Sequence, residues 1–327
     1  GIDPWAFECC AGLTSIVIPD SVTSIGYGAF YETGIYNNPS NWENGVLYID
    51  KYLIEANDDI SGEYVIKAGT TVIANSAFDW CEKLTGVVIP DSVKFICDDA
   101  FFGCAFNSIK IPQSVIYIGK YAFDECNSLA SIDVDENNQK YSSDEYGVLF
   151  NKDKTEIIRY PIGNMRTKYT LPDSVVNIGD WSFDNCRNLV VVIIPDGVKK
   201  IGCGAFESCE SLTSITIPNS VVSIGDWAFC ECYDLTSVNI SDGVERIGVC
   251  AFDGSGIYTN PSNWEDGVLY IGNHLIAVDF FVTGKYVVKQ GTKTIAGCAF
   301  GGCFGITNVV IPEGVKRVGA DAFACCT

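Results

Sequence analysis

Cysteine and histidine have the most direct capacity for chemistry in this sequence, which contains 16 Cys but one His in 327 residues. Cysteine thiolates act as nucleophiles or bind zinc, but Cys230-x-Cys232 has no second pair of thiols beside it at a zinc spacing. The single His274 leaves most nucleophilic and acid–base mechanisms without their usual general base. We therefore predict no catalytic residue, no metal site and no cofactor.

Carboxylates are abundant, with Asp+Glu 41 against Lys+Arg 21 and a net charge of −20. Asp133-x-Asp135-x-Asn137 begins like a calcium loop, but Asn138 stands where that loop needs Gly and Asp144 where it needs Glu. We interpret it as a solvated acidic turn. Paired carboxylates of the kind that cleave glycosides are present by residue type, but nothing marks one pair as special, so we predict a protein that is not an enzyme.

The same composition argues against nucleic-acid binding, against a membrane span and against a disordered chain. Binding to nucleic acid requires an excess of Lys and Arg, which this chain lacks. The sequence has no run of eighteen apolar residues, so we predict no membrane span. Apolar residues make up 47% and aromatic residues 12% of the chain, and this content predicts a folded core, not a disordered tail.

The elements that position these side chains follow from an internal repeat. An Ala-Phe pair, once Ser-Phe, recurs at a nearly constant spacing, and the longer gaps equal one repeat plus an insertion. The pairs end at Phe7, Phe30, Phe78, Phe101, Phe123, Phe183, Phe206, Phe229, Phe252, Phe300 and Phe323. Twelve positions before the Phe of every complete repeat stands an aliphatic residue, such as Ile194 or Ile217. This regularity predicts a solenoid.

One repeat, Leu212–Cys232, shows the expected coil. Ile215 and Ile217 alternate with polar residues, which is typical of a half-buried strand. Pro218 ends that strand, because it cannot donate to a ladder. A second short strand is expected over 221–224, and a single helical or 3-10 turn over 226–232 with its Ala-Phe pair pointing into the core. Such coils stack as a parallel sheet.

Most of the cysteines belong to this repeat. Nine of them stand three residues after a repeat Phe: Cys10, Cys81, Cys104, Cys126, Cys186, Cys209, Cys232, Cys303 and Cys326. We expect a buried column of small apolar side chains. Side chains in a ladder point in parallel directions, which keeps neighbouring Cβ atoms too far apart for an unstrained disulfide, so we predict free thiols along the column. The other cysteines are left open.

The pattern Leu-x-x-Ile-x-Ile-Pro-x-Ser-Val-x-x-Ile-Gly-x-x-Ala-Phe-x-x-Cys resembles the 23-residue leucine-rich repeat of BspA-like bacterial surface proteins. The segment from Tyr141 to Thr155 resembles an insertion of that family. The resemblance implies a leucine-rich repeat solenoid that is β-rich and has its parallel sheet on the concave face. It also implies an exported or surface-attached protein that binds host or matrix proteins or other cells.

We expect residues 1–327 to form a single solenoid with hairpin-like insertions within about 34–62, 135–168 and 256–284. The first and third are copies: GIYNNPSNWENGVLYI from Gly34 and GIYTNPSNWEDGVLYI from Gly256 are identical at 14 of 16 positions. In this alignment His274 matches Tyr52, so a ring is wanted there and ionisation is not. Trp42 and Trp264 are either anchors of a projecting loop or its plugs. Because both ends fall within a repeat, we expect an excerpt from, or the mature part of, a longer exported protein.

The residue before the aligned aliphatic position on the first strand faces outward in every coil and gives the candidate binding surface. The column consists of Val17, Val65, Val88, Lys110, Asp133, Thr170, Ile193, Thr216, Asn239, Val287 and Val310. Long shallow faces of this kind suit protein ligands, and little of the column is charged. The plain alternative is that β-branched residues favour strands.

Two other functions remain open. Aromatic residues two positions before the repeat Phe, such as Trp181 and Trp227, could stack on sugar rings in a carbohydrate-binding module, or simply cover the turn. The chain could also be a spacer that displays another domain. The leading prediction is a non-catalytic extracellular or cell-surface protein that binds host or neighbouring-cell proteins.

Overall fold

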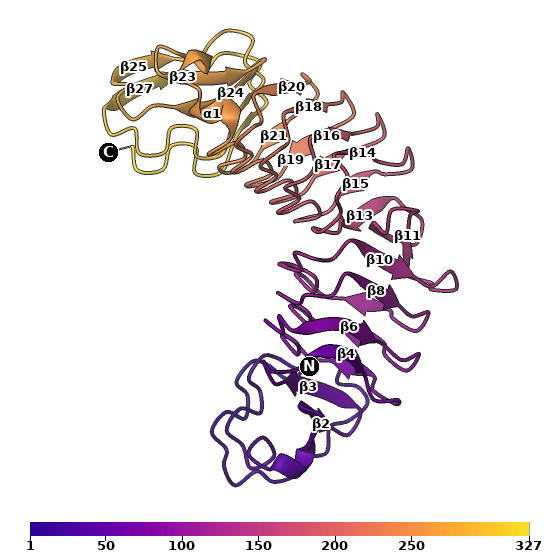
Figure 1. Ribbon diagram of the computed structural model, residues 1–327. Coiled ribbons are helices and arrows are strands. Elements are labelled where there is room, and N and C mark those ends of the chain that lie inside the picture. The colour runs from indigo at the N-terminus through magenta and orange to yellow at the C-terminus, as the bar shows by residue number, and fades with distance from the viewer. Residues whose placement is uncertain (327) are drawn as a thin grey trace. The chain divides into compact units, whose positions relative to one another are not determined.

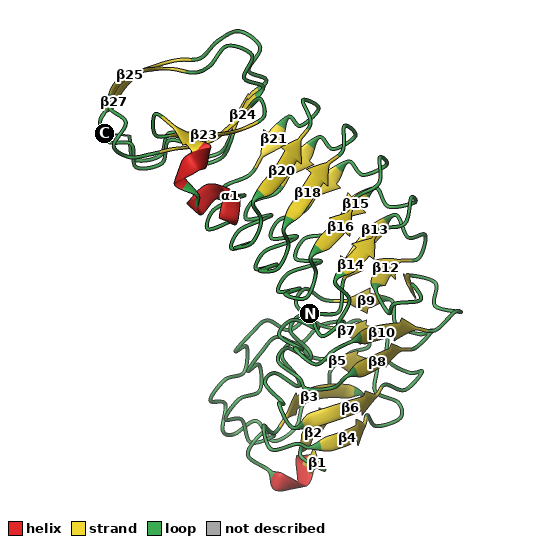
Figure 2. Cartoon of the chain, turned by 45° about the horizontal axis from the view of Figure 1, so that its top comes forward, coloured by secondary structure: helices red, strands yellow, loops and turns green. Residues whose placement is uncertain are grey.

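The structure, a computed structural model, describes residues 1–326 and divides into two compact units. The first comprises Gly1–Lys152 and Pro161–Asn164, and the second comprises Asp153–Tyr160 and Met165–Thr327. Both units consist of stacked coils with short strands and little helix (Figures 1 and 2). The predicted β-rich solenoid with parallel sheets is confirmed.

In the first unit two parallel ladders run along the stack. Each coil contributes a longer strand to what we call the first ladder and a two-residue strand to the second ladder. The first ladder contains the pairs β4 (Gly62–Val65) with β6 (Leu84–Val88) and β8 (Ser108–Ile111) with β10 (Ser131–Val134). The second ladder contains β5 (Val72–Ile73), β7 (Phe95–Ile96) and β9 (Tyr117–Ile118).

The second unit repeats this arrangement. Its first ladder contains β14 (Lys168–Thr170), β16 (Val191–Ile193), β18 (Ser214–Ile217) and β20 (Ser237–Ile240), and further on the pair β25 (Gly284–Val287) and β27 (Ile306–Val310). Its second ladder contains β15 (Asn177–Ile178), β17 (Lys200–Ile201), β19 (Ser223–Ile224) and β21 (Arg246–Ile247), and the pair β26 (Thr294–Ile295) and β28 (Arg317–Val318). Inward and outward side chains alternate along the longer strands; β18, for example, alternates exposed and buried residues.

The predicted hairpin-like insertions are confirmed, and each sends a strand into a second ladder. The first insertion contains η1 (Pro39–Asn41), β1 (Trp42–Glu43), β2 (Val46–Ile49) and β3 (Tyr52–Ala56), with β2 antiparallel to β3 and β3 parallel to β5. Its copy contains α1 (Gly256–Thr259), η2 (Pro261–Asn263), β22 (Trp264–Glu265), β23 (Val268–Ile271) and β24 (His274–Val278), and β24 runs parallel to β26. From the middle insertion come β11 (Tyr141–Ser143) and β12 (Leu149–Asn151) in the first unit and β13 (Glu156–Arg159), parallel to β15, in the second.

The Ala-Phe segment differs from the predicted helical or 3-10 turn, because it forms a series of tight turns. Its N–H groups alternate between the next coil and their own: Trp181 N donates to Cys203 O at 2.8 Å, Ser182 N to Gly179 O at 3.4 Å, and Phe183 N to Ala205 O at 2.8 Å. This alternation requires left-handed residues two positions before and after the Phe, as at Trp181 (φ 59) and Asn185 (φ 57). The segment therefore behaves as a third, irregular ladder, which satisfies backbone groups that a lone helical turn would leave unpaired.

The Phe rings stack along the core of each unit as the repeat predicts. Phe206 is fully buried, with ring centroids 4.8 Å from Phe183 and 5.2 Å from Phe229, and the planes lie within 10° of parallel. Tyr160, one repeat length before Phe183, takes the Phe position of the middle insertion and stacks at 5.4 Å. One ring per coil thus gives a continuous apolar column, and offset aromatic pairs of this kind add to the free energy of burial.

Candidate functional site

The cysteine column has a structural role. All sixteen cysteines, which lie within residues 1–326, are thiols and not disulfides, and most of the column is buried, although Cys10 is exposed. The thiol of Cys209 donates to Phe183 O at 3.1 Å, and that of Cys232 donates to Phe206 O at 3.0 Å, so both of these thiols reach the Phe carbonyl of the preceding coil. Burial raises the pKa of the Cys209 thiol well above its ordinary value. A protonated, enclosed thiol is a poor nucleophile, and the column packs the core.

His274 occupies the place that the alignment predicts. It is fully buried, with Nδ1 2.7 Å from Thr294 Oγ1 and Nε2 3.1 Å from Ser241 O. In the other copy Tyr52 Oη donates to Pro19 O at 2.9 Å, and Pro19 corresponds to Ser241. Burial lowers the pKa of His274. The imidazole therefore replaces a phenol as a hydrogen-bonding core ring.

The tryptophans of the copied insertions are plugs. Trp42 Nε1 donates to Tyr36 O at 2.8 Å, and Trp264 Nε1 donates to Tyr258 O at 2.7 Å. The Tyr36–Trp42 and Tyr258–Trp264 rings are in edge contact at 5.2 and 5.3 Å. Because both indoles are held in the same way within their own loops, the projecting-anchor interpretation receives no support.

The segment that begins like a calcium loop is closed by its own backbone. Asp135 Oδ1 accepts from Asn137 N at 3.0 Å, and the buried Asn138 donates to Pro112 O and Val115 O at 2.9 and 3.0 Å. Asn138 thus ties this coil to the preceding one. Among residues 1–326, no group of three or more His, Cys, Asp or Glu side chains is arranged to hold a metal ion.

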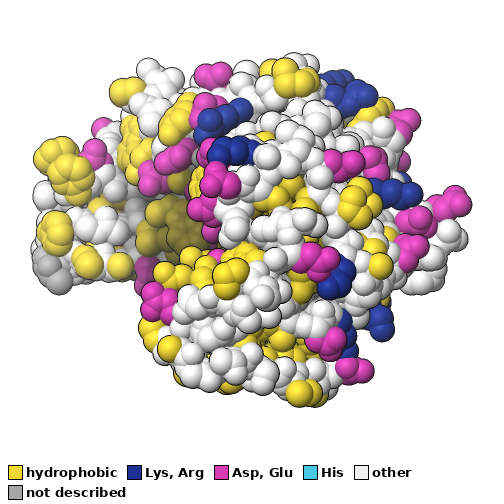
Figure 3. All heavy atoms as spheres, turned by 60° about the horizontal axis from the view of Figure 1, so that its bottom comes forward, with side chains coloured by type: hydrophobic (Ala, Val, Ile, Leu, Met, Phe, Trp, Pro, Cys, Tyr) yellow, Lys and Arg dark blue, Asp and Glu magenta, His cyan; other side chains and the backbone are white. Residues whose placement is uncertain are grey.

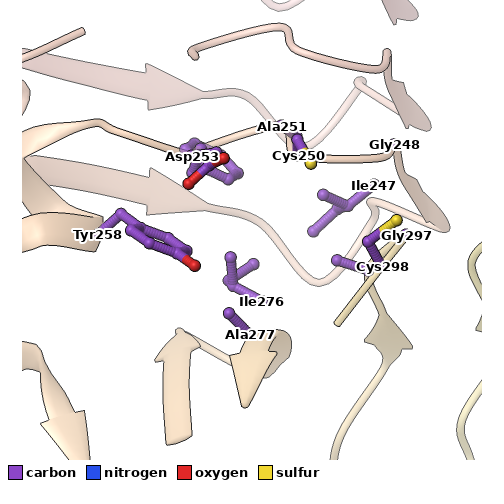
Figure 4. Close-up of a pocket in the computed structure, with 12 residues that line it drawn as sticks. Ile247, Gly248, Cys250, Ala251, Asp253, Tyr258, Ile276, Ala277, Gly297 and Cys298 are labelled. Atoms are coloured by element: carbon purple, nitrogen blue, oxygen red, sulfur yellow. The ribbon is translucent and has the colours of Figure 1, made fainter. Parts of the chain in front are cut away.

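A small cavity of about 70 Å³ lies in the second unit, where the copied insertion meets the stack. Figure 4 shows Cys250 and Cys298 on one side of it and Asp253 and Tyr258 on the other. Ala277 lines it and aligns with Glu55 of the first copy. This volume is far below the roughly 300–1,000 Å³ of a small-molecule pocket, so we assign no ligand to it.

Ten of the eleven predicted outward positions lie on strands of the first ladder, Val17 lies outside the strands, and all eleven are exposed. Its apolar members range from Val310, 40% exposed, to Val17, 94% exposed. The strand registers place column residues on the same rungs, as for Val65 with Val88 and Thr170 with Ile193. The column therefore forms an aligned row within each unit, which we call the ladder face.

The ladder face is hollowed in the first unit. A depression of about 560 Å³ is lined by residues of β4, β6 and β8, including Val88 and Lys110, by residues of the corners after β6 and β8, and by Asp135, which follows β10. Lys110 is directly opposite Asp133 on the neighbouring strand, so the two charged members of the column share a rung. The sequence did not reveal this depression, because it forms between residues of several consecutive coils.

Acidic side chains lie mostly away from the ladder face, on turns and corners. In Figure 3 Asp and Glu are scattered among apolar side chains without forming one continuous patch. Two of those on the Ala-Phe turns are half-buried: burial and then Asp98 raise the pKa of Asp99 to about 6, and burial and then Asp184 raise that of Glu207 to about 7. Among the described residues no helix is long and apolar enough to cross a membrane.

These features define a leucine-rich repeat solenoid in which each coil corresponds to one sequence repeat and the core is a Phe and Cys column. A family model described as "BspA type Leucine rich repeat region (6 copies)" matches residues 1–62, 48–161, 163–277 and 283–327. The chain belongs to the BspA-type leucine-rich repeat family, as its repeat pattern indicated. This family is a repeat scaffold, and its fold is consistent with protein binding.

Two solved structures show the same fold. One is a leucine rich cell surface protein from Faecalibacterium prausnitzii, with 26% sequence identity, 77% of this chain and 73% of that chain covered, and a TM-score of 0.55. The other is a leucine-rich repeat protein from Eubacterium ventriosum, with 22% identity, 99% and 80% covered, and a TM-score of 0.53. A search of curated proteins finds no match.

Proposed function

We propose that this chain is a non-catalytic, surface-attached or secreted protein that binds proteins of a host or of neighbouring cells through its ladder face. The observation that carries the proposal is the ladder face itself, where eleven exposed positions, nine of them uncharged, lie in rows on a protein with a net charge of −20. Depletion of charge at the centre is typical of protein interfaces. The F. prausnitzii relative is described as a cell surface protein, which supports the proposed location.

The depression beside Val88 strengthens the choice of this face. An apolar side chain of a partner can fill the depression and so be removed from water. Buried side chains of this kind supply most of the binding free energy at protein interfaces. Lys110 and Asp135 at its rim offer charged groups that can orient the partner.

The test places a negative charge on the ladder face at three positions, Val88→Glu, Ile193→Glu and Thr216→Glu. Each residue is exposed, so the variant is expected to keep its thermal stability and lose retention of cell-surface proteins on an affinity column. A matched control places Glu at Ile116, Val176 and Val222, which are 45%, 37% and 43% exposed and lie off the ladder face. Equal retention by both variants would mean that the ladder face is not the site.

One observation favours carbohydrate binding as a second candidate. Trp181 and Trp227, two coils apart, lean toward each other over Gly204, with centroids 6.5 Å apart and planes 24° from parallel. Trp227 is 42% exposed, and an exposed indole face can pack against the CH groups of a sugar ring. A glycan array with the wild type and with Trp181→Ala and Trp227→Ala tests this. No signal, or no change in the variants, removes the candidate.

A further inference from the structure

The Ala-Phe segments of the first unit, which we also call its turn segments, bring together Trp5, Tyr27 and Tyr31 in what we call the aromatic corner. The Trp5 indole lies against the backbone of Gly28, where an added Cβ would be 2.3 Å from Trp5 Cζ3. The Tyr27 ring stands at 84° to the indole, with centroids 4.9 Å apart, and the Tyr31 ring stands at 90° and 6.2 Å. The three residues are 43%, 48% and 39% exposed. The indole is thus a floor with two ring walls, open to solvent.

Glu55 is linked to this aromatic corner through Tyr36, and Asp58 and Asp79 act on it electrostatically. The Tyr36 ring is in edge contact with Tyr31, with centroids 5.3 Å apart. Burial, and then the charges of Glu55, Asp79 and Asp58, raise the pKa of the Tyr27 hydroxyl. Glu55 Oε1 accepts a hydrogen bond from the Tyr36 hydroxyl at 2.9 Å. Among residues 1–326, no ion pair of the structure joins Glu55, Asp58 or Asp79 to a Lys or Arg. Among residues 1–326 these carboxylates therefore have no basic partner, and burial raises the pKa of Glu55 and of Asp79.

The repeat does not require this combination, as the duplicated block shows. In the alignment that pairs Gly34 with Gly256 the floor is kept, since Trp5 corresponds to Trp227. The two Tyr walls are not kept, because Val249 replaces Tyr27 and Asp253 replaces Tyr31. The three carboxylates are not kept either, because Ala277 replaces Glu55, Phe280 replaces Asp58 and Gly301 replaces Asp79. The coil therefore folds without two Tyr walls and without these carboxylates, so the first copy's set is not explained by packing alone.

We propose that Trp5, Tyr27, Tyr31 and the adjacent carboxylates form a binding site for an organic cation, the guanidinium or ammonium group of a basic side chain on a partner protein. Aromatic faces carry negative potential and attract cations within about 6 Å of the ring centroid. The carboxylates add to this attraction, and a cation that enters relieves their mutual repulsion. A neutral sugar would gain from the rings and nothing from the excess negative charge.

This site lies on the turn segments, outside the ladder face, and its test is independent of the proposed function. The variant with Glu at Val88, Ile193 and Thr216 keeps the aromatic corner intact. If this variant loses partner retention and still binds the cation, the ladder face and the aromatic corner are separate sites. A failure of the cation-binding proposal therefore leaves the proposed function of the ladder face untouched, and a failure of the proposed function leaves the cation site untouched.

The probe is N-acetyl-arginine methylamide, with the citrulline analogue as its neutral isostere, followed by tryptophan fluorescence and by NMR of the ring protons. We expect saturable millimolar binding of the arginine probe and at least fivefold weaker binding of the citrulline probe. Tyr27→Val, which installs the residue of the other copy, should weaken arginine binding at least threefold, and so should the double variant Glu55→Gln, Asp79→Asn. Trp227→Ala, the matched control in the second copy, should leave it unchanged.

The proposal is overturned if the citrulline probe binds equally well, because the rings alone would then suffice. It is also overturned if Tyr27→Val, with an unaltered circular dichroism spectrum, binds arginine as the wild type does. In that case the interaction is general attraction to an acidic chain, which 0.5 M salt would abolish for every variant alike.

Discussion

Gly204 offers the sharpest test of the packing on the turn segments. It has φ +55, and a Cβ added there would lie 2.1 Å from Cε3 of Trp181. Gly204→Ala therefore carries two penalties: about 1–2 kcal/mol for a left-handed residue with a Cβ, and about 1–3 kcal/mol for overpacking against the indole. We expect a loss of about 2–5 kcal/mol in the free energy of unfolding.

The second penalty depends on Trp181, and a double-mutant cycle isolates it. In a Trp181→Gly background the clash is absent, so Gly204→Ala should cost only the left-handed term, about 1–2 kcal/mol. Gly254→Ala is the matched control in the same unit, because Gly254 has φ +67 but its nearest neighbour, Glu231 Cγ, is 3.5 Å from the added Cβ.

Urea denaturation followed by far-UV circular dichroism gives the three free-energy differences, and Trp181 emission reports whether the indole has moved into solvent. A coupling free energy of about 1–3 kcal/mol is expected between positions 181 and 204. If Gly204→Ala lowers the free energy of unfolding by the same amount with and without Trp181, the indole does not rest on Gly204 and the described packing on the Ala-Phe segments is wrong.

Three further predictions follow from the core and the buried acids. Phe206→Ala should lower the free energy of unfolding by about 3–5 kcal/mol, because its ring stacks on a neighbour on both sides. Phe7→Ala removes a ring with one stacked neighbour, at 5.4 Å, and should lower it by about half as much in urea denaturation. Equal losses would contradict the stacked column of rings. Native protein should react with a thiol reagent at the exposed Cys9, Cys10 and Cys325 long before Cys209, and denatured protein should show all 16 thiols; fewer would reveal disulfides. Burial, as the largest cause, raises the pKa of Glu207 from 4.5 to about 7. Between these two pH values the native protein keeps a proton on Glu207 that the unfolded chain has released. The free energy of unfolding should therefore fall as the pH rises from 4.5 to 7. Glu207→Gln should flatten that slope in melting curves at pH 4 and 8, and an unchanged slope would argue against a buried Glu207.

The sequence was sufficient for those features that each coil repeats. The Phe spacing predicted the stacked rings, the alternation of Ile215 and Ile217 predicted a half-buried strand, and the alignment with Tyr52 predicted a buried ring at His274. These features are local or periodic, and the repeat states them many times over.

The turn geometry and the surface features could not be predicted in the same way. The tight turns over the Ala-Phe pair depend on hydrogen bonds to the next coil, as between Trp181 N and Cys203 O, which no single repeat contains. The aromatic corner combines Trp5 and Tyr27 with Glu55, residues that come together only once the insertion has joined the stack. In the sequence, the aromatic corner could have been noticed only by comparing the two copies of the duplicated block, which differ at Tyr27 and Glu55.

The binding role of the ladder face is tested most directly by site-specific photo-crosslinking from two positions of one coil. Thr216 lies on the ladder face in β18, and Val222, 43% exposed, lies on the corner before β19. With benzoylphenylalanine at either position, irradiation on target cells should give a protein adduct from position 216 and none from position 222. An adduct from position 222 alone, or equal adducts from both, would contradict binding through the ladder face.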